Sequence, residues 1–172
     1  AHRGALTTKL LSVHAIEHGE PLRFAAASTE GGLRWYRAEG VERIEPAEEP
    51  YVAIAEREVR AFLDASAGGF HAGGEARPYE FFVRLPEARW VARNLPHPLA
   101  VSSVEGGALV RGTTAGLPVI AAYVVGLGDA ARALSDELRR EVVRLARGAL
   151  ASNERALRKG KVRAVGSKRA MG

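Results

Sequence analysis

The chain has 172 residues, a size that allows one ordinary domain or two small ones. Hydrophobic residues make up 47% and charged residues 26%, which excludes a disordered or collagen-like chain. Because there are no cysteines, disulfide frameworks, thiol nucleophiles and thiolate metal sites are excluded as well. The net charge of +5 invites a nucleic-acid partner, so the location of that charge matters.

The positive charge is concentrated at the C-terminal end. Residues 154–172 hold seven basic residues and one acidic residue, a net charge of +6, whereas residues 1–153 hold 18 basic and 19 acidic residues, a net charge of −1. We expect a nearly neutral folded part followed by a basic tail, either a flexible arm or a solvated helix end. Such a tail either contacts nucleic acid or only keeps the chain in solution.

Membrane insertion is not expected. The longest apolar stretch, Leu117–Gly128, has about twelve residues and is too short to cross a bilayer. The first residues lack the layout of a secretory signal, and we expect a cytoplasmic protein.

The first part of the chain has the patterns of strands. Leu6–Ile16 is rich in β-branched and apolar residues, although a helix is not excluded there. Strands at Leu22–Ala27 and Leu33–Ile44 flank the turn residues 28–32, which predicts a hairpin. Apolar residues at helical spacing between Glu56 and Asp64 predict one short helix.

The second part alternates strands and helices. The elements predicted in chain order are a strand at Tyr79–Leu85, a helix at Glu87–Asn94 closed by Pro96 and Pro98, a hairpin of Leu99–Val104 with Ala108–Thr113, a buried helix at Leu117–Leu127, a strand at Ala131–Leu134 and a helix capped by Ser135. This order is that of the split βαβ, or ferredoxin-like, arrangement with one extra C-terminal helix. The predicted fold class is therefore α+β.

Four segments follow from these patterns. They are a β-rich domain at residues 1–66, a glycine-rich linker at 67–78, a ferredoxin-like domain at 79–153 and the basic tail at 154–172.

One string matches a metal-site motif. His14-Ala-Ile-Glu17-His18 fits H-x-x-E-H, in which helical spacing puts two imidazoles on one zinc ion. Gly19 and Pro21 end the segment at once, so a long helix is not expected here. We expect surface histidines and no metal.

No arrangement of residues predicts catalysis. The sequence has no G-x-S-x-G before a helix, no phosphate-binding P-loop and no G-x-G-x-x-G after a strand. The acidic run Glu42–Glu49 is typical of a solvated turn. We expect no enzyme and no cofactor.

The segment Leu33-Arg-Trp-Tyr-Arg37 combines basic and aromatic residues. On a strand, Arg34 and Tyr36 point to one face while Trp35 and Arg37 point to the other. Interleaved arginines and aromatic rings suit stacking on bases and neutralisation of phosphates. A core strand with flanking arginines explains the same pattern, and the sequence leaves both interpretations open.

The string Gly32-Leu-Arg-Trp-Tyr-Arg-Ala-Glu-Gly-Val41 resembles the arginine-rich strand of WYL-domain transcriptional regulators. Further strings resemble this family's C-terminal extension and follow in the same order over about residues 5–150. They are Glu49-Pro-Tyr51, Glu80-Phe-Phe-Val-Arg-Leu85, Ala88-Arg-Trp-Val-Ala92, Val125-Gly-Leu-Gly-Asp129 and Leu134-Ser-Asp-Glu-Leu-Arg139.

The resemblance implies an Sm-like β-barrel followed by a ferredoxin-like extension, in a bacterial regulator that forms a homodimer. It also implies an effector on the barrel, in some relatives single-stranded nucleic acid, and a winged helix that binds DNA and lies outside these 172 residues. The residues expected to contact the effector are Arg34, Tyr36 and Arg37, with Arg23 and Lys9 as weaker candidates.

Two positions depart from the family pattern. The Trp-Tyr-Leu triplet has no counterpart near Leu22–Ala25, where Phe24 alone keeps an aromatic side chain, and Gly40 stands in place of an arginine. The alternative is a protein–protein or oligomerisation module without nucleic-acid affinity. Its expected basic interface is formed by Arg89, Arg93, Arg140, Arg144 and Arg147.

Overall fold

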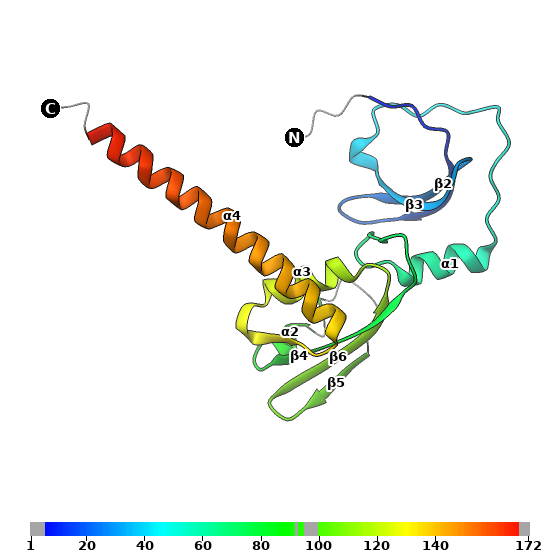
Figure 1. The fold of residues 1–172 in the computed structure, drawn as a ribbon. Helices are drawn as coiled ribbons and strands as arrows, with labels where there is room; N and C mark the ends of the chain where they lie inside the picture. Colours follow the sequence, from blue (N-terminus) through cyan, green and yellow to red (C-terminus); the bar gives the residue numbers. More distant parts are fainter. Residues whose placement is uncertain (1–5, 92, 95–99, 169–172) are drawn as a thin grey trace. The chain divides into compact units, whose positions relative to one another are not determined.

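The computed structural model describes residues 6–91, 93–94 and 100–168. Its described residues form a mixed α+β structure with antiparallel sheets of three and four strands and four α-helices (Figure 1). The α+β class is therefore confirmed. By its contacts the chain divides into a first unit, residues 1–76 with 114–116, and a second unit, residues 77–113 with 117–172.

The first unit contains the three-stranded sheet, in the order β1 (Ser12–Glu17), β2 (Arg23–Ser28) and β3 (Gly31–Arg37). The antiparallel pairing of β2 with β3 across a short turn confirms the predicted hairpin. Ala25, Ala26 and Ala27 of the central strand are fully buried, since their small side chains lie between the strands on either side.

The third strand is shorter than predicted. It ends at Arg37, and Ala38–Gly40 form the short 3₁₀ helix η1, in which the Val41 N–H donates to the Ala38 carbonyl at 3.0 Å. Residues 41–55 continue as a loop that contains no strand. Its prolines cannot donate to a ladder and its glutamates have low strand propensity, which explains why the strand does not reach Ile44.

The predicted short helix is confirmed as α1 (Glu56–Ala65). The following residues, the first part of the expected linker, pack into the first unit. Ala67 and Phe70 exchange backbone hydrogen bonds of 3.0 Å across Gly68 and Gly69, whose φ angles of 55° and 69° are readily adopted only by glycine. These two glycines therefore form a tight turn, and Ala67 is fully buried.

The second unit contains the four-stranded sheet in the order β5-β6-β4-β7. Its elements are β4 (Arg77–Arg84), α2 (Ala88–Val91), β5 (Ala100–Val104), β6 (Gly107–Thr114), α3 (Leu117–Gly126), the 3₁₀ helix η2 (Gly128–Ala130), β7 (Ala131–Ala133) and α4 (Asp136–Lys168). The predicted sequence of strands and helices, and the β5–β6 hairpin, are confirmed.

The helices pack on one face of this sheet. Phe81 of β4 is fully buried and its ring lies 6.4 Å from that of Tyr123 in α3, which in turn stacks on Trp90 of α2 at 6.2 Å. Helix α2 covers only part of the predicted Glu87–Asn94, and the closing Pro96, Pro98 and Leu99 lie outside the described residues.

Helix α4 extends well beyond the part that packs on the rest of the second unit. It runs 33 residues and includes residues 154–168, so the basic tail takes the second of its two expected forms, a helix end. Every side chain from Ala146 to Leu157 is exposed. Nowhere in the described ranges does a helix combine the length and apolar character needed to cross a membrane.

Candidate ligand-binding site on the three-stranded sheet

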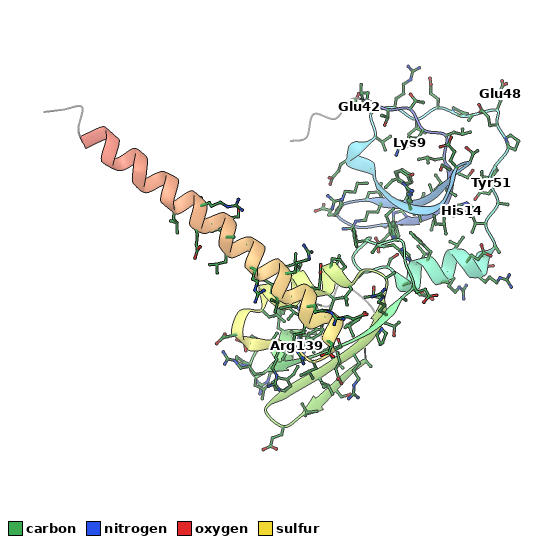
Figure 2. The ribbon with its side chains drawn as sticks, in the orientation of Figure 1. Lys9, His14, Glu42, Glu48, Tyr51 and Arg139 are labelled. Atoms are coloured by element: carbon green, nitrogen blue, oxygen red, sulfur yellow. The ribbon has the colours of Figure 1, made fainter. Side chains whose placement is uncertain are left out.

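The candidate site is the face of the β2–β3 hairpin that carries Tyr36. Phe24 and Tyr36 are paired directly across the two strands, and their rings stack with centroids 5.5 Å apart and planes 16° from parallel. Lys9, which is labelled in Figure 2, comes from the segment before β1. Its Nζ lies 5.6 Å from the centre of the Tyr36 ring. This face therefore combines two partly exposed rings with a cation.

Arg34 adds a second cation to the same face. It lies two residues before Tyr36 on β3 and therefore on the same face of the strand. Its partner on β2 is Ala26, two residues after Phe24. Its side chain is exposed and has no hydrogen bond or ion pair with any residue that the structure describes. Three of the five expected ligand contacts, Lys9, Arg34 and Tyr36, thus lie together.

The other two expected contacts lie on the opposite face. Arg23 and Arg37 are paired with each other across β2 and β3, one residue away from the Phe24–Tyr36 pair. Arg23 forms an ion pair of 3.4 Å with Glu17 and covers Gly69, where an added Cβ would lie 2.4 Å from the arginine Cδ. Arg23 therefore has a structural role, and Arg37 cannot share a ligand with Tyr36 on the opposite face.

Trp35 anchors the sheet to α1 on that same opposite face. Its Nε1 donates a 2.8 Å hydrogen bond to Ser66 Oγ, which donates to the Phe62 carbonyl at 2.6 Å. The Trp35 and Phe62 rings lie 5.9 Å apart. The interpretation as a core strand therefore fits the face that carries Trp35, whereas the ligand-binding interpretation of the partly exposed face that carries Tyr36 stays a prediction.

Residues of the metal motif lie on and beside a strand. His14 and Glu17 belong to β1, so the helical spacing that the motif requires is absent. His14 Nδ1 is 2.9 Å from the Tyr51 hydroxyl, which donates to the Val13 carbonyl, and these contacts hold loop 41–55 against β1 (Figure 2). No group of three potential metal ligands occurs among the described residues.

The expected basic interface is spread over two helices. Arg89 lies on α2 and Arg93 just beyond it, whereas the other three members lie on α4, and all five are exposed. Arg144 is held by Glu141 through bonds of 2.8 and 2.5 Å, and this hydrogen-bonded arginine lowers the pKa of the Glu141 carboxyl. Arg144 is therefore partly neutralised, while Arg140 and Arg147 have no ion pair with the described residues.

Charge is unevenly divided along the chain. Residues 1–76 hold eight basic and twelve acidic residues, a net charge of −4, whereas residues 77–153 hold ten and seven, a net charge of +3. The cations of the candidate site thus belong to an acidic unit. This arrangement suits a ligand with few phosphates better than a long nucleic-acid strand.

Phe24 was not among the ligand contacts expected from the sequence, although its ring stacks on that of Tyr36. The register of the hairpin shifts by one residue between Ala26 and Ser28. A regular count from the turn would therefore pair Phe24 with Trp35, and only the shifted register brings it opposite Tyr36. No local pattern indicates that Lys9 reaches the ring. In the comparisons with known proteins, neither the family models nor the curated proteins include a match to this chain.

Proposed function

We propose that the face formed by Lys9, Phe24, Arg34 and Tyr36 binds an aromatic anion, a nucleotide or a short single-stranded nucleic acid. The observation that carries this proposal is the stacked ring pair with two cations that have no acidic partner among the described residues. A base stacks on such rings, and Lys9 and Arg34 neutralise its phosphates.

The resemblance in sequence makes this unit the effector-sensing part of a cytoplasmic WYL-type transcriptional regulator that forms a homodimer and works with a winged helix outside this chain. Two features support the fold that this assignment requires. The strand order β5-β6-β4-β7 with helices on one face is that of a ferredoxin-like domain. The sheet β1–β2–β3 is curved, which is compatible with three strands of the proposed Sm-like barrel (Figure 1).

Fluorescence anisotropy with a labelled oligothymidylate at low salt tests the ligand site. Arg34→Ala should weaken binding several-fold, whereas Arg37→Ala, on the same strand but the opposite face, should leave it unchanged. With two cations facing the strand, log affinity should fall with log salt at a slope of about −1.4. Absence of binding at low salt would contradict the proposal.

The basic tail requires its own control. A chain ending at Asn153 lacks the net +6 of residues 154–172 but keeps the whole candidate site. Its affinity for the oligonucleotide should stay within a few-fold of the full chain. If binding disappears with the tail, the tail and not the sheet is the nucleic-acid contact.

The second candidate function is an oligomerisation module without nucleic-acid affinity. The net charge of −4 on residues 1–76 favours it, because an acidic unit repels polyanions at a distance. A stable dimer that fails to bind oligonucleotide or mononucleotide would select this function.

A further inference from the structure

The outer part of α4 presents large apolar side chains to solvent at a fixed interval. Val143, Leu150 and Leu157 are seven residues apart and are 41%, 61% and 68% exposed. The buried face of the helix instead contains Leu138, which packs in the second unit. Isolated helices gain little stability from propensity alone, so an exposed segment of this length needs a partner.

We propose that α4 pairs with α4 of a second copy of this chain as an antiparallel coiled coil. Val143, Leu150 and Leu157 occupy one of the two seam positions of a heptad, and the smaller Ala146 and Asn153 occupy the other, which gives a narrow seam of alternating large and small side chains. A seam formed by one chain fits a second copy of itself.

The inference names the interface of the homodimer in the proposed function and rests on it in that respect, but it does not depend on the ligand site. A dimer that survives loss of Leu150 and Leu157 would contradict this interface alone, whereas a wild-type monomer would contradict the homodimer as well.

The small residues of the repeat fix the register. With the two helices crossing between Ala151 and Ser152, Leu157 lies opposite the second copy's Ala146, and Leu150 lies opposite the second copy's Asn153. Each large side chain then meets a smaller one, which lets the two helices interdigitate.

Charge favours the antiparallel orientation. Glu154 is the only acidic residue after Glu141, and in this register it lies on the same flank of the helix pair as the second copy's Arg147, two residues along from the directly opposite Ala149. Neither Glu154 nor Arg147 has an ion pair with the described side chains of its own chain. A parallel pair would instead bring together two segments 154–172, each with a net charge of +6.

Sedimentation velocity of the full chain over a concentration series tests the pairing. The wild type should be a dimer, and Leu150→Asp with Leu157→Asp should make it a monomer. Ala151→Asp with Ser152→Asp adds the same charges outside the seam and should leave the dimer intact. Circular dichroism checks that both variants remain folded. A wild-type monomer up to roughly 0.1 mM overturns the proposal.

Charge reversal tests the register. Arg147→Glu and Glu154→Arg should each weaken the dimer roughly tenfold, since each creates two like-charge contacts per dimer. The double variant should recover the wild-type affinity. If the double variant is weaker than both single ones, the proposed register is wrong.

The absence of cysteine allows a direct test of orientation. Ala146→Cys with Leu157→Cys should form intermolecular disulfides, whereas neither single variant should, because each residue lies far from its own copy in an antiparallel pair. Rapid crosslinking of Leu157→Cys alone would indicate a parallel pair and contradict the proposal.

Discussion

The two sheets of this protein both present an aromatic ring among arginines, yet they differ in what those arginines contact. On the three-stranded sheet, Arg34 and Lys9 stand beside the Phe24–Tyr36 stack without an acidic partner in the described part of the chain. On the four-stranded sheet, Phe82 lies on the face away from the helices, directly opposite Arg132 of β7.

Two of the three cations on that second face are already paired, and Arg132 is the one without an ion pair to the described residues. Arg84 contacts Asp129 at 2.8 Å and Arg111 contacts Glu80 at 2.6 Å. A paired arginine offers less to a phosphate, because the ligand must first displace a carboxylate. The comparison teaches that free cations, and not a local count of arginines and rings, distinguish a binding face from an ordinary one.

The largest expected effect comes from removing the support beneath the candidate site. Trp35→Ala should destabilise the first unit by about 3 kcal/mol, since it removes both ring packing on Phe62 and the hydrogen bond to Ser66. Trp90→Ala, at a 54% exposed tryptophan of the second unit, is the matched control and should cost about 1 kcal/mol. Urea unfolding followed by circular dichroism measures both. Equal losses would show that Trp35 is no anchor.

The next effect compares the two faces directly. Tyr36→Ala should weaken oligothymidylate binding about tenfold, because one stacking ring contributes roughly 1–3 kcal/mol. Phe82→Ala, the corresponding change on the four-stranded sheet, should leave the anisotropy titration unchanged. If Phe82→Ala has the larger effect, the ligand site has been assigned to the wrong sheet.

A smaller effect should appear when the paired arginines are released. Glu80→Gln together with Asp129→Asn removes the carboxylates from Arg111 and Arg84 without changing side-chain size. The double variant should bind oligonucleotide a few-fold more tightly at low salt and show a steeper salt dependence. Glu75→Gln together with Glu105→Gln removes two exposed carboxylates that have no ion pair with the described residues, and so controls for the same change in net charge. An equal gain in this control would mean that pairing is irrelevant.

The smallest effect is a pH dependence of the first unit. Burial lowers the pKa of His71, which stacks on Phe62 at 4.6 Å and accepts the Gly73 N–H at Nδ1. Because the folded form resists protonation, stability is complete above the unfolded pKa of about 6.5 and decreases as the pH falls below it. Thermal unfolding should be measured at about pH 7.5 and about pH 5, on either side of that pKa. Between the two, the melting temperature should decrease less for His71→Gln than for the wild type. An identical decrease in both would exclude His71 as the cause.

Much of the fold follows from local patterns. The β2–β3 and β5–β6 hairpins were predictable because glycine-containing turns separate their strands, and the order of elements after Arg77 follows from hydrophobic periodicity. The turn at Gly68–Gly69 was not recognised, since paired glycines occur equally in linkers. The length of α4 was not predicted either, because glycines such as Gly148, which have low helix propensity, interrupt its hydrophobic pattern.

The candidate site was only partly predictable. Alternation along β3 places Arg34 and Tyr36 on one face, but it cannot tell which face is packed. That distinction depends on Trp35 meeting Ser66, 31 residues later, which no local pattern contains. For the same reason Arg23 and Arg37 were grouped with Arg34 and Tyr36, although their side chains lie on the opposite face of the sheet.

Residues 114–116 belong to the first unit, but they follow residues 77–113 of the second unit in the chain. Ala115 donates to the Ala65 carbonyl at 2.8 Å and accepts from the Ala72 N–H at 3.0 Å, and Gly116 sits where a Cβ would approach Ala67 and Phe70 to within 3 Å. A chain synthesised only to residue 76 lacks Ala115, so the Ala65 carbonyl and the Ala72 N–H have no such partner at that stage. These contacts of the N-terminal unit can therefore form only after β4, β5 and β6 have been synthesised.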